Sequence, residues 1–574
     1  MRQHIPPTGL DRVALKKAPP DLVINNGLLF NSFTGEFIEG QSLWIKDGWI
    51  AYAGPDKRPK TGDGTDFMDA RGMVLLPGLM EGHTHILNLT GIEEFVRHVI
   101  PSGTTTVITE TIELATIVGI DGIRYFVQGI ENQPLRFFYT LSPLCGLIPT
   151  VEANVPSNED LLPFLEAPGC LGLGEIYWGN LLLEGVQGER VRELVRLTLS
   201  MGKRLEGHSA GASGSKLQAY TSFGVSSCHE PITEKEVLER LRLGYWVMIR
   251  QGAIRKELDG VKGIFQAPVD KRRLVLCTDS MDPEGFLSEG YLDAAVRHAL
   301  HLGIDPSQVY QMVTLNVAEH FRLDHILGSL SPGRLADMVI IPSPEDYHPQ
   351  TVIRGGKVIF QDGKNLVEPR NASFPEAMFR TVNIPEIPSI LPPKEGRVRA
   401  VEMVTRLVTK EAIVELSDPR EPGCLNMALA IDRTGGGEAF LGFIKGFGLK
   451  QGACGSTMCW DTPDMIVLGC DALSMETVIG RLKASGGGAV YAIGREVVAE
   501  FPASLCGVVT VERMETARAQ VWEFEEKLHQ NGVPWENPLL ALNTQGNAAI
   551  PHFRLTHNGY VRMKDRTVLP LVVA

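Results

Sequence analysis

The stretch Leu75-Leu76-Pro77-Gly78-Leu79-Met80-Glu81-Gly82-His83-Thr84-His85 decides the fold, because an apolar run leads directly into two histidines separated by one residue. In an extended strand, side chains at positions i and i+2 point to the same side. His83 and His85 can therefore bind one metal ion together. A pair of this kind is also typical of two histidines on a solvent-exposed strand, so the interpretation depends on partners elsewhere in the chain.

Strand-like and helix-like segments alternate through the region that follows, from about residue 77 to 330. The expected strands are residues 78–85, 104–110, 137–142, 170–176, 204–208, 224–229, 245–250 and 273–279. Eight strands with intervening helices over about 250 residues indicate a (β/α)₈ barrel. In this fold, side chains at the carboxyl ends of the strands form the active site.

Polar residues stand at the ends of five of these expected strands. They are His83, His85, Glu175, His208, His229 and Asp279. Four imidazoles and two carboxylates on one face would suit two divalent ions bridged by a carboxylate and a hydroxide. A single histidine or glutamate at a strand end is more often an ordinary hydrogen-bond partner. Six such residues in order along five strand ends predict a metal centre.

Shorter alternating strands, broken by glycine, flank the barrel region on both sides. They occupy about residues 21–71 and return at 336–341 and 351–360. We therefore expect an α/β fold in which the metal-dependent (β/α)₈ barrel is inserted in a small β-sandwich and is followed by a C-terminal α/β domain. The expected boundaries are 1–76 and 331–370 for the sandwich halves, 77–330 for the barrel and 395–574 for the C-terminal domain.

Composition excludes several classes of partner. The chain has 574 residues, and its net charge of −13 argues against nucleic acid or an anionic membrane surface as the main partner. No apolar run approaches the ~20 residues that a membrane span requires, and the N-terminus lacks the apolar segment of a secretory signal. The nine cysteines are scattered singly, which suits a reducing cytoplasm. We expect a cytoplasmic protein that acts on a small molecule.

Four further motifs join the histidine pair in a recognisable pattern. They are Gly172-Leu173-Gly174-Glu175, Glu206-Gly207-His208-Ser209-Ala210-Gly211, Cys228-His229-Glu230 and Cys277-Thr278-Asp279. Together with residues 77–85 they resemble the amidohydrolase superfamily and, within it, the bacterial adenine deaminase family. The resemblance covers almost the whole chain and includes Gly446-Phe447-Gly448-Leu449-Lys450 near the C-terminus.

The resemblance implies a role for each of the six strand-end residues. His83 and His85 would hold one ion, Glu175 would bridge, and His208 and His229 would hold the second ion. Asp279 would ligate a metal and shuttle protons. The implied cofactors are two divalent metal ions, which are manganese, iron or zinc.

The implied reaction is hydrolytic deamination of an aminopurine, which is adenine or a substituted relative. A metal-bound hydroxide would attack the amine-bearing carbon, and ammonia would leave. Glu113 or Glu110 would protonate a ring nitrogen, although both are also typical of ordinary carboxylates after a strand. We expect a heterocyclic small-molecule substrate and a homodimer or higher homo-oligomer.

The sequence departs from the family pattern around this metal set. Glu110-Thr111-Ile112-Glu113 stands where the family has Asp-Pro-His-Glu, and Cys459-Trp460-Asp461-Thr462-Pro463-Asp464 stands where it has Ala-His-Asp-Ser-His-Asn. We therefore predict two metals without accessory ions, and a more apolar pocket wall that suits a substrate bulkier or less polar than adenine. Residues 459–464 are also typical of a surface turn, and a separation of more than ~15 Å from His83 would contradict the substrate argument.

Two other functions stay open at this point. The same hydroxide would serve a binuclear-metal hydrolase of another cyclic amide or amidine heterocycle, since only the substrate pocket distinguishes the two reactions. A non-catalytic metal-binding or structural paralogue is the third hypothesis. Loss of a core ligand would favour that third hypothesis, and none of the six is lost.

Overall fold

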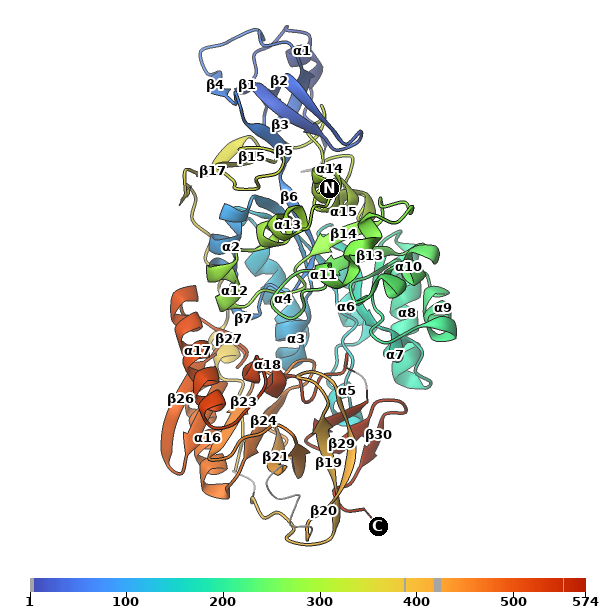
Figure 1. Ribbon diagram of the computed structural model, residues 1–574, viewed down its shortest axis with the longest axis vertical. Helices are drawn as coiled ribbons and strands as arrows, with labels where there is room; N and C mark the ends of the chain where they lie inside the picture. The colour runs from blue at the N-terminus through green and yellow to red at the C-terminus, as the bar shows by residue number, and fades with distance from the viewer. Residues whose placement is uncertain (1–4, 387–388, 418–424, 551, 574) are drawn as a thin grey trace.

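The computed structural model describes residues 5–386, 389–417, 425–550 and 552–573. Residues 1–4 of the expected sandwich and residues 418–424, 551 and 574 of the expected C-terminal domain lie outside this description. An N-terminal sheet stands at one end of the long axis, a barrel in the middle and a second large sheet at the other end (Figure 1). Within the described ranges, no helix combines the length and apolarity that crossing a bilayer requires.

Eight parallel strands form the middle layer. They are β6 (Leu79–Thr84), β8 (Thr104–Thr109), β9 (Arg136–Leu141), β10 (Cys170–Tyr177), β11 (Arg204–His208), β12 (Ser227–Cys228), β13 (Trp246–Arg250) and β14 (Leu274–Cys277). Five of them form one sheet in the order β11-β10-β9-β8-β6, and β12, β13 and β14 form a three-stranded sheet. These strands correspond to the eight strand-like segments of the sequence, although β12 is only two residues long.

Backbone hydrogen bonds close the two sheets into a ring. At one seam, the Ser226 amide donates to the Leu205 carbonyl across 3.1 Å. At the other, Asp279 N–H donates to His83 O across 3.1 Å and His85 N–H donates to Asp279 O across 2.9 Å. The molecule is therefore a TIM-barrel-like α/β protein, and its second seam lies directly at the histidine pair.

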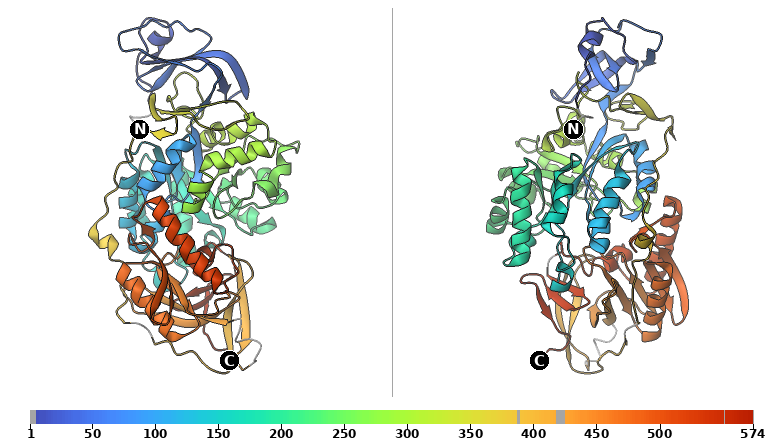
Figure 2. Two further views of the ribbon diagram at one scale, coloured as in Figure 1. Left: turned by 60° about the vertical axis from the view of Figure 1, so that its left-hand side comes forward. Right: turned by 180° about the vertical axis from the view of Figure 1, so that it is seen from behind.

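Helices cover the outside of the ring (Figure 2). They include α2 (Ile92–Val99), α4 (Ile120–Ile130), α6 (Asn158–Glu166), α8 (Val186–Ser200), α9 (Gly214–Thr221), α10 (Glu234–Arg242), α13 (Leu292–His301) and α14 (Pro306–Met312). In α2, the buried Ile92, Phe95, Val96 and Val99 recur at the spacing of one helix face. Burying such a face against the strands holds the barrel wall in place.

The N-terminal sheet combines strands from before and after the barrel. Its members are β1 (Leu22–Asn31), β2 (Glu36–Lys46), β3 (Trp49–Gly54), β4 (Asp66–Asp69), β5 (Val74–Pro77), β15 (Met338–Ile341), β16 (Thr351–Arg354), β17 (Lys357–Gln361) and β18 (Lys364–Asn365). β5 pairs in parallel with β1 and antiparallel with β15. β5, which leads into the barrel, is therefore held between β1 and β15, and β15 follows the barrel in the sequence.

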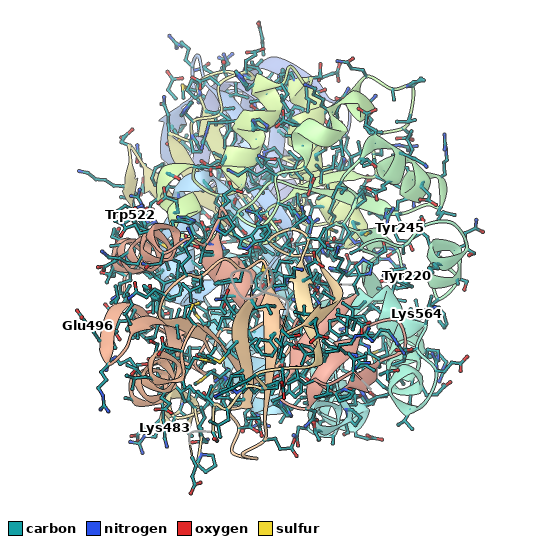
Figure 3. The ribbon with its side chains drawn as sticks, turned by 60° about the horizontal axis from the view of Figure 1, so that its bottom comes forward. Tyr220, Tyr245, Lys483, Glu496, Trp522 and Lys564 are labelled. Carbon is teal, nitrogen blue, oxygen red and sulfur yellow. The ribbon has the colours of Figure 1, made fainter. Side chains whose placement is uncertain are left out.

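The C-terminal region is built on an eight-stranded sheet. Its strands, in spatial order, are β20 (Thr409–Glu415), β19 (Arg397–Met403), β22 (Ala439–Lys445), β21 (Leu425–Asp432), β24 (Asp464–Gly469), β23 (Ala453–Ser456), β25 (Gly488–Ile493) and β26 (Glu496–Pro502). The helices α16 (Ala472–Ser485), α17 (Met514–Gln530) and α18 (Pro538–Asn543) and the hairpin strands β28 (Phe553–Thr556), β29 (Gly559–Arg562) and β30 (Thr567–Leu569) complete it. In the view from this end, these strands lie in front of the barrel, with Trp522 on one flank and Tyr220 and Tyr245 on the other (Figure 3).

The C-terminal region contacts the barrel at several separate points. β27 (Val509–Thr510) pairs in parallel with β7 (Leu89–Thr90), which lies shortly after the histidine pair. The Met514 amide donates to Glu94 of α2 across 2.9 Å. Arg518 forms a bidentate ion pair with Glu284, with distances of 2.6 and 3.2 Å. These ties place the C-terminal sheet against the face of the barrel at which its strands end.

Candidate metal centre

All six strand-end residues from the sequence lie together at the carboxyl ends of the barrel strands. His83 is the last residue but one of β6. Glu175 lies near the end of β10, and His208 is the last residue of β11. The remaining three, His85, His229 and Asp279, follow β6, β12 and β14 by one or two residues. Each is buried except His85, which is half-buried.

The histidine pair faces two carboxylates. His85 Nε2 lies 2.9 Å and His83 Nε2 lies 3.3 Å from the same oxygen, Oε1 of Glu175. His83 Nε2 is also 3.2 Å from Oδ1 of Asp279. One ligand atom from each of these four side chains falls within 4.8 Å of all the others. Two imidazoles and two carboxylates at this spacing are a suitable donor set for a divalent transition metal.

A second group of donors shares Glu175. His208 Nε2 lies 3.9 Å from Oε2 of Glu175, and His229 Nε2 lies 3.8 Å from its Oε1. The rings of His83 and His229 are stacked, with centroids 4.0 Å apart. Glu175 therefore belongs to both groups of donors, with Oε2 toward His208 and Oε1 toward His229 and the histidine pair.

The charges of the cluster are strongly interdependent. Burial disfavours the charged form of His83, but the hydrogen bonds that its ring donates to Asp279, Glu110 and Glu175 hold its pKa well above the usual range. Burial likewise opposes ionisation of Glu175, yet the surrounding imidazoles, with His229 the strongest, hold its pKa well below the usual range. The cluster therefore presents ionised carboxylates to its histidines, and a bound cation would take the place of the protons.

Glu230 and Arg250 extend the cluster beyond the residues that sequence reasoning assigned. Glu230 Oε1 lies 3.4 Å from Nε2 of both His208 and His229. Arg250, at the end of β13, donates to Glu230 across 2.5 Å and to Oδ2 of Asp279 across 3.2 Å. Arg250 could have been identified from the sequence, because it is the last residue of the expected seventh strand. The proposed ligands come from the same position on other strands.

The two carboxylates after β8 contact the outer nitrogens of the histidine pair. Glu113 Oε1 lies 2.8 Å from His85 Nδ1, and Glu110 Oε1 lies 3.4 Å from His83 Nδ1. Glu110 also accepts a hydrogen bond from the Thr140 hydroxyl across 2.6 Å. Carboxylates at this position fix the orientation of a ligating imidazole and the nitrogen that it presents to a metal.

A third carboxylate, Glu81, fixes the backbone of the cluster. It is fully buried on β6 and accepts hydrogen bonds from His83 N–H across 3.1 Å and from Thr278 N–H across 3.0 Å. The Thr278 hydroxyl donates to it as well, across 2.8 Å. Burial raises the pKa of Glu81 to about 7. Glu81 was not among the predicted site residues, although it stands two residues before His83.

A cavity of about 240 Å³ opens beside the cluster. Glu175 and Tyr177 line it from the barrel, and Asp461 and Pro463 line it from the C-terminal region. Its remaining wall is largely apolar, with contributions from Ile112, Ala115, Ile117, Leu144, Val151 and Val155. The stretch 459–464 therefore reaches the cavity, and the alternative of a distant surface turn is wrong.

Trp460 does not take the place that the sequence suggested. It is absent from the cavity wall and packs against Ile254, Leu407 and Leu540. Asp461 is turned toward the cavity instead, with a backbone φ of 60°, and the Tyr177 hydroxyl donates to its Oδ2 across 3.1 Å. Burial, with the Glu175 charge adding to it, raises the pKa of Asp461 to about 6.

Comparison with known proteins connects this site to one family. A family model described as the adenine deaminase C-terminal domain matches residues 402–567, and one described as the amidohydrolase family matches residues 74–359. Among solved structures, a β-aspartyl dipeptidase from Fervidobacterium islandicum superposes with a TM-score of 0.46 at 17% identity, over 62% of this chain and 98% of that one.

Relatives with known names match over nearly the whole length. The adenine deaminase of Desulfatibacillum aliphaticivorans is 31% identical over 558 residues, which are 95% of this chain and 95% of that protein. The adenine deaminase of Moorella thermoacetica is 31% identical over 573 residues, which are 96% of this chain and 95% of that protein. With such identity over almost all of both proteins, this chain belongs to the adenine deaminase family.

Proposed function

We propose that this protein is a metal-dependent hydrolase that deaminates adenine, using water to release ammonia and form hypoxanthine. One observation carries the proposal: two groups of side chains that could hold metal ions share Glu175, which also lines a cavity of about 240 Å³. The full-length relatives named adenine deaminase support the choice of substrate.

The proposed metal site divides along Glu175. His83, His85 and Asp279 would hold one divalent ion, His208 and His229 would hold the other, and Glu175 would bridge. Manganese, iron and zinc all accept this nitrogen and oxygen donor set. Such ions, when bound, lower the pKa of a water ligand toward ~7 and so supply a nucleophile at neutral pH.

Asp279 is the proposed proton carrier. Its Oδ1 faces the histidine pair, and its Oδ2 is held by Arg250 at 3.2 Å. Although burial opposes ionisation, the hydrogen bond from His83 and the charges of His229 and Arg250 hold the pKa of Asp279 well below the usual range. It is therefore ionised at neutral pH, and can accept a proton from the attacking water and deliver it to the leaving ammonia.

Glu113 is better placed than Glu110 to protonate a ring nitrogen. The Glu113 side chain is 15% exposed and follows Ile112, which lines the cavity, whereas the Glu110 side chain is 2% exposed and lies behind His83. We assign Glu110 to orienting His83. Glu113 contacts His85 and is the more exposed of the two, so we assign to it the proton transfer to the purine ring.

The proposal also covers compartment and assembly. Eight free cysteines among the described residues support a reducing cytoplasm. A homodimer or higher homo-oligomer stays a prediction from the sequence, and sedimentation equilibrium of the purified protein measures it.

A substrate panel tests the proposed function. Purified protein loaded separately with manganese, iron or zinc is incubated with adenine, adenosine, a hydantoin and a lactam, and ammonia release and ring opening are measured. We expect ammonia and hypoxanthine in equal amounts from adenine. Ring opening of the hydantoin or lactam without adenine turnover would replace deamination by cyclic-amide hydrolysis, and metal binding without turnover of any of them would make the chain a non-catalytic relative.

A further inference from the structure

One carboxylate on the cavity wall has no part in the metal centre. Among the residues that line the cavity, Glu175 and Asp461 are the two that carry carboxylates, and they come from the barrel and from the C-terminal sheet respectively. Asp461 lies in the turn between β23 and β24, on the part of the wall that the C-terminal region supplies. It is the residue through which that region offers charge to a ligand.

Asp461 is held in a fixed direction. The Tyr177 hydroxyl donates to its Oδ2 across 3.1 Å. Because Tyr177 and Glu175 are two residues apart on β10, one strand carries both the proposed metal bridge and the anchor of Asp461. A carboxylate can accept about four hydrogen bonds. The bond from Tyr177 therefore leaves acceptor capacity for a ligand in the cavity.

The chemistry of adenine restricts what this acceptor can bind. Adenine has two kinds of hydrogen-bond donor, the exocyclic amine and the imidazole N–H, and its other ring nitrogens are acceptors. Deamination requires the amine-bearing carbon to face the metal cluster. The imidazole N–H lies on the opposite edge of the bicycle, so it is the donor left for a cavity carboxylate that is not one of the proposed metal ligands.

We propose that Asp461 is a specificity-determining residue that accepts a hydrogen bond from the imidazole N–H of a free purine base. Purines substituted at N9, including nucleosides, lack this donor and place a substituent against the carboxylate. The C-terminal region therefore selects free bases, while the barrel performs the hydrolysis. This inference rests on the proposed adenine deaminase function.

The test compares adenine with 9-methyladenine in four proteins: the wild type, Asp461→Ala, Asp461→Asn and the control Asp464→Asn. Asp464 is a fully buried carboxylate at the start of β24, directly after this turn, but it is bonded to His557 at 2.6 Å and does not line the cavity. Each protein is loaded with the same metal, and its metal content and kcat and KM are measured.

We expect Asp461→Ala to lower kcat/KM for adenine by roughly 10- to 100-fold, which is the range for one hydrogen bond to a charged group. The loss should appear mainly in KM, and 9-methyladenine should lose nothing, so that the preference for adenine over 9-methyladenine falls at least tenfold. Asp464→Asn should keep the wild-type preference. An unchanged preference in Asp461→Ala with wild-type metal content would overturn the inference.

Binding of the product separates this inference from the proposed function. Calorimetry with hypoxanthine and 9-methylhypoxanthine needs no turnover, and Asp461→Asn serves if Asp461→Ala does not fold. We expect wild type to prefer hypoxanthine and Asp461→Asn to lose roughly several-fold of that preference, because its amide oxygen accepts only a neutral hydrogen bond; equal preference in both proteins would contradict the role of Asp461. A wild type that binds these bases but leaves adenine unchanged would refute the proposed function instead.

Discussion

The barrel and the C-terminal region contribute to one cavity in different ways. The barrel supplies all six proposed metal ligands from the ends of parallel strands, where backbone pairing fixes each side chain. The C-terminal region supplies Asp461 from a turn with φ of 60°, a conformation that aspartate tolerates better than most residues. In the proposals made above, the strand ends carry the reaction and the turn selects the substrate.

Loss of a barrel ligand should have the largest effect. We expect His83→Ala and His208→Ala to lose bound metal and to lower turnover by roughly 10³-fold or more, because a metal ion supplies several kcal/mol of stabilisation to such a reaction. The fold should survive, since both side chains lie at strand ends and the apolar core is made by other residues. Metal analysis, circular dichroism and turnover are measured together, and near-native turnover in either variant would remove that residue from the site.

Asp279→Asn should separate metal binding from proton transfer. The amide can still offer an oxygen ligand but cannot carry the proton, so we expect much of the metal to remain while kcat falls by ~10²-fold or more. Turnover and metal content are measured on the same preparation of the variant. A variant that keeps more than a tenth of wild-type activity would show that another group moves the proton.

Glu110→Gln and Glu113→Gln form a matched pair that sharpens the comparison within the barrel. Both should weaken metal affinity by about 10- to 100-fold, since each carboxylate fixes a ligating imidazole. At saturating metal, we expect Glu110→Gln to regain its kcat and Glu113→Gln to keep a defect, because the proposed proton transfer to the ring is assigned to Glu113. Equal recovery of both variants would reduce Glu113 to an orienting role.

The barrel could be predicted from the sequence, whereas the cavity could not. Apolar strand segments alternate with amphipathic helix segments along the sequence, so the end of each barrel strand can be located in the sequence. His83, Glu175 and Asp279 could be identified at such ends without coordinates. The contact between Tyr177 and Asp461 joins residues 284 positions apart, and no local pattern specifies it. The position of Trp460 could not be predicted for the same reason. Its large apolar ring suggested a place in the cavity wall, but its position depends on packing against Ile254 and Leu407.

The smallest expected effect is on stability in the C-terminal region. Burial raises the pKa of Glu525, on α17, from 4.5 to about 7. The folded state therefore holds this proton more tightly than the unfolded state, so the contribution of Glu525 to stability falls as the pH rises from about 4.5 to about 7 and is level above that. We expect Glu525→Gln to raise stability at pH 8 by roughly 1–3 kcal/mol, the upper figure being the full value of this shift at ~1.4 kcal/mol per pKa unit, and to change nothing at pH 4.5. Thermal denaturation at both pH values measures this, and equal shifts at the two pH values would contradict it.

The division of labour between the two regions is tested most directly by the metal content of three proteins prepared side by side: the wild type, His83→Ala and Asp461→Ala. Metal-to-protein ratios are measured by mass spectrometry, and adenine turnover is measured on the same samples. The account predicts wild-type metal with a raised KM in Asp461→Ala, and loss of metal with loss of kcat in His83→Ala. Loss of metal in Asp461→Ala, or full metal and turnover in His83→Ala, would contradict it.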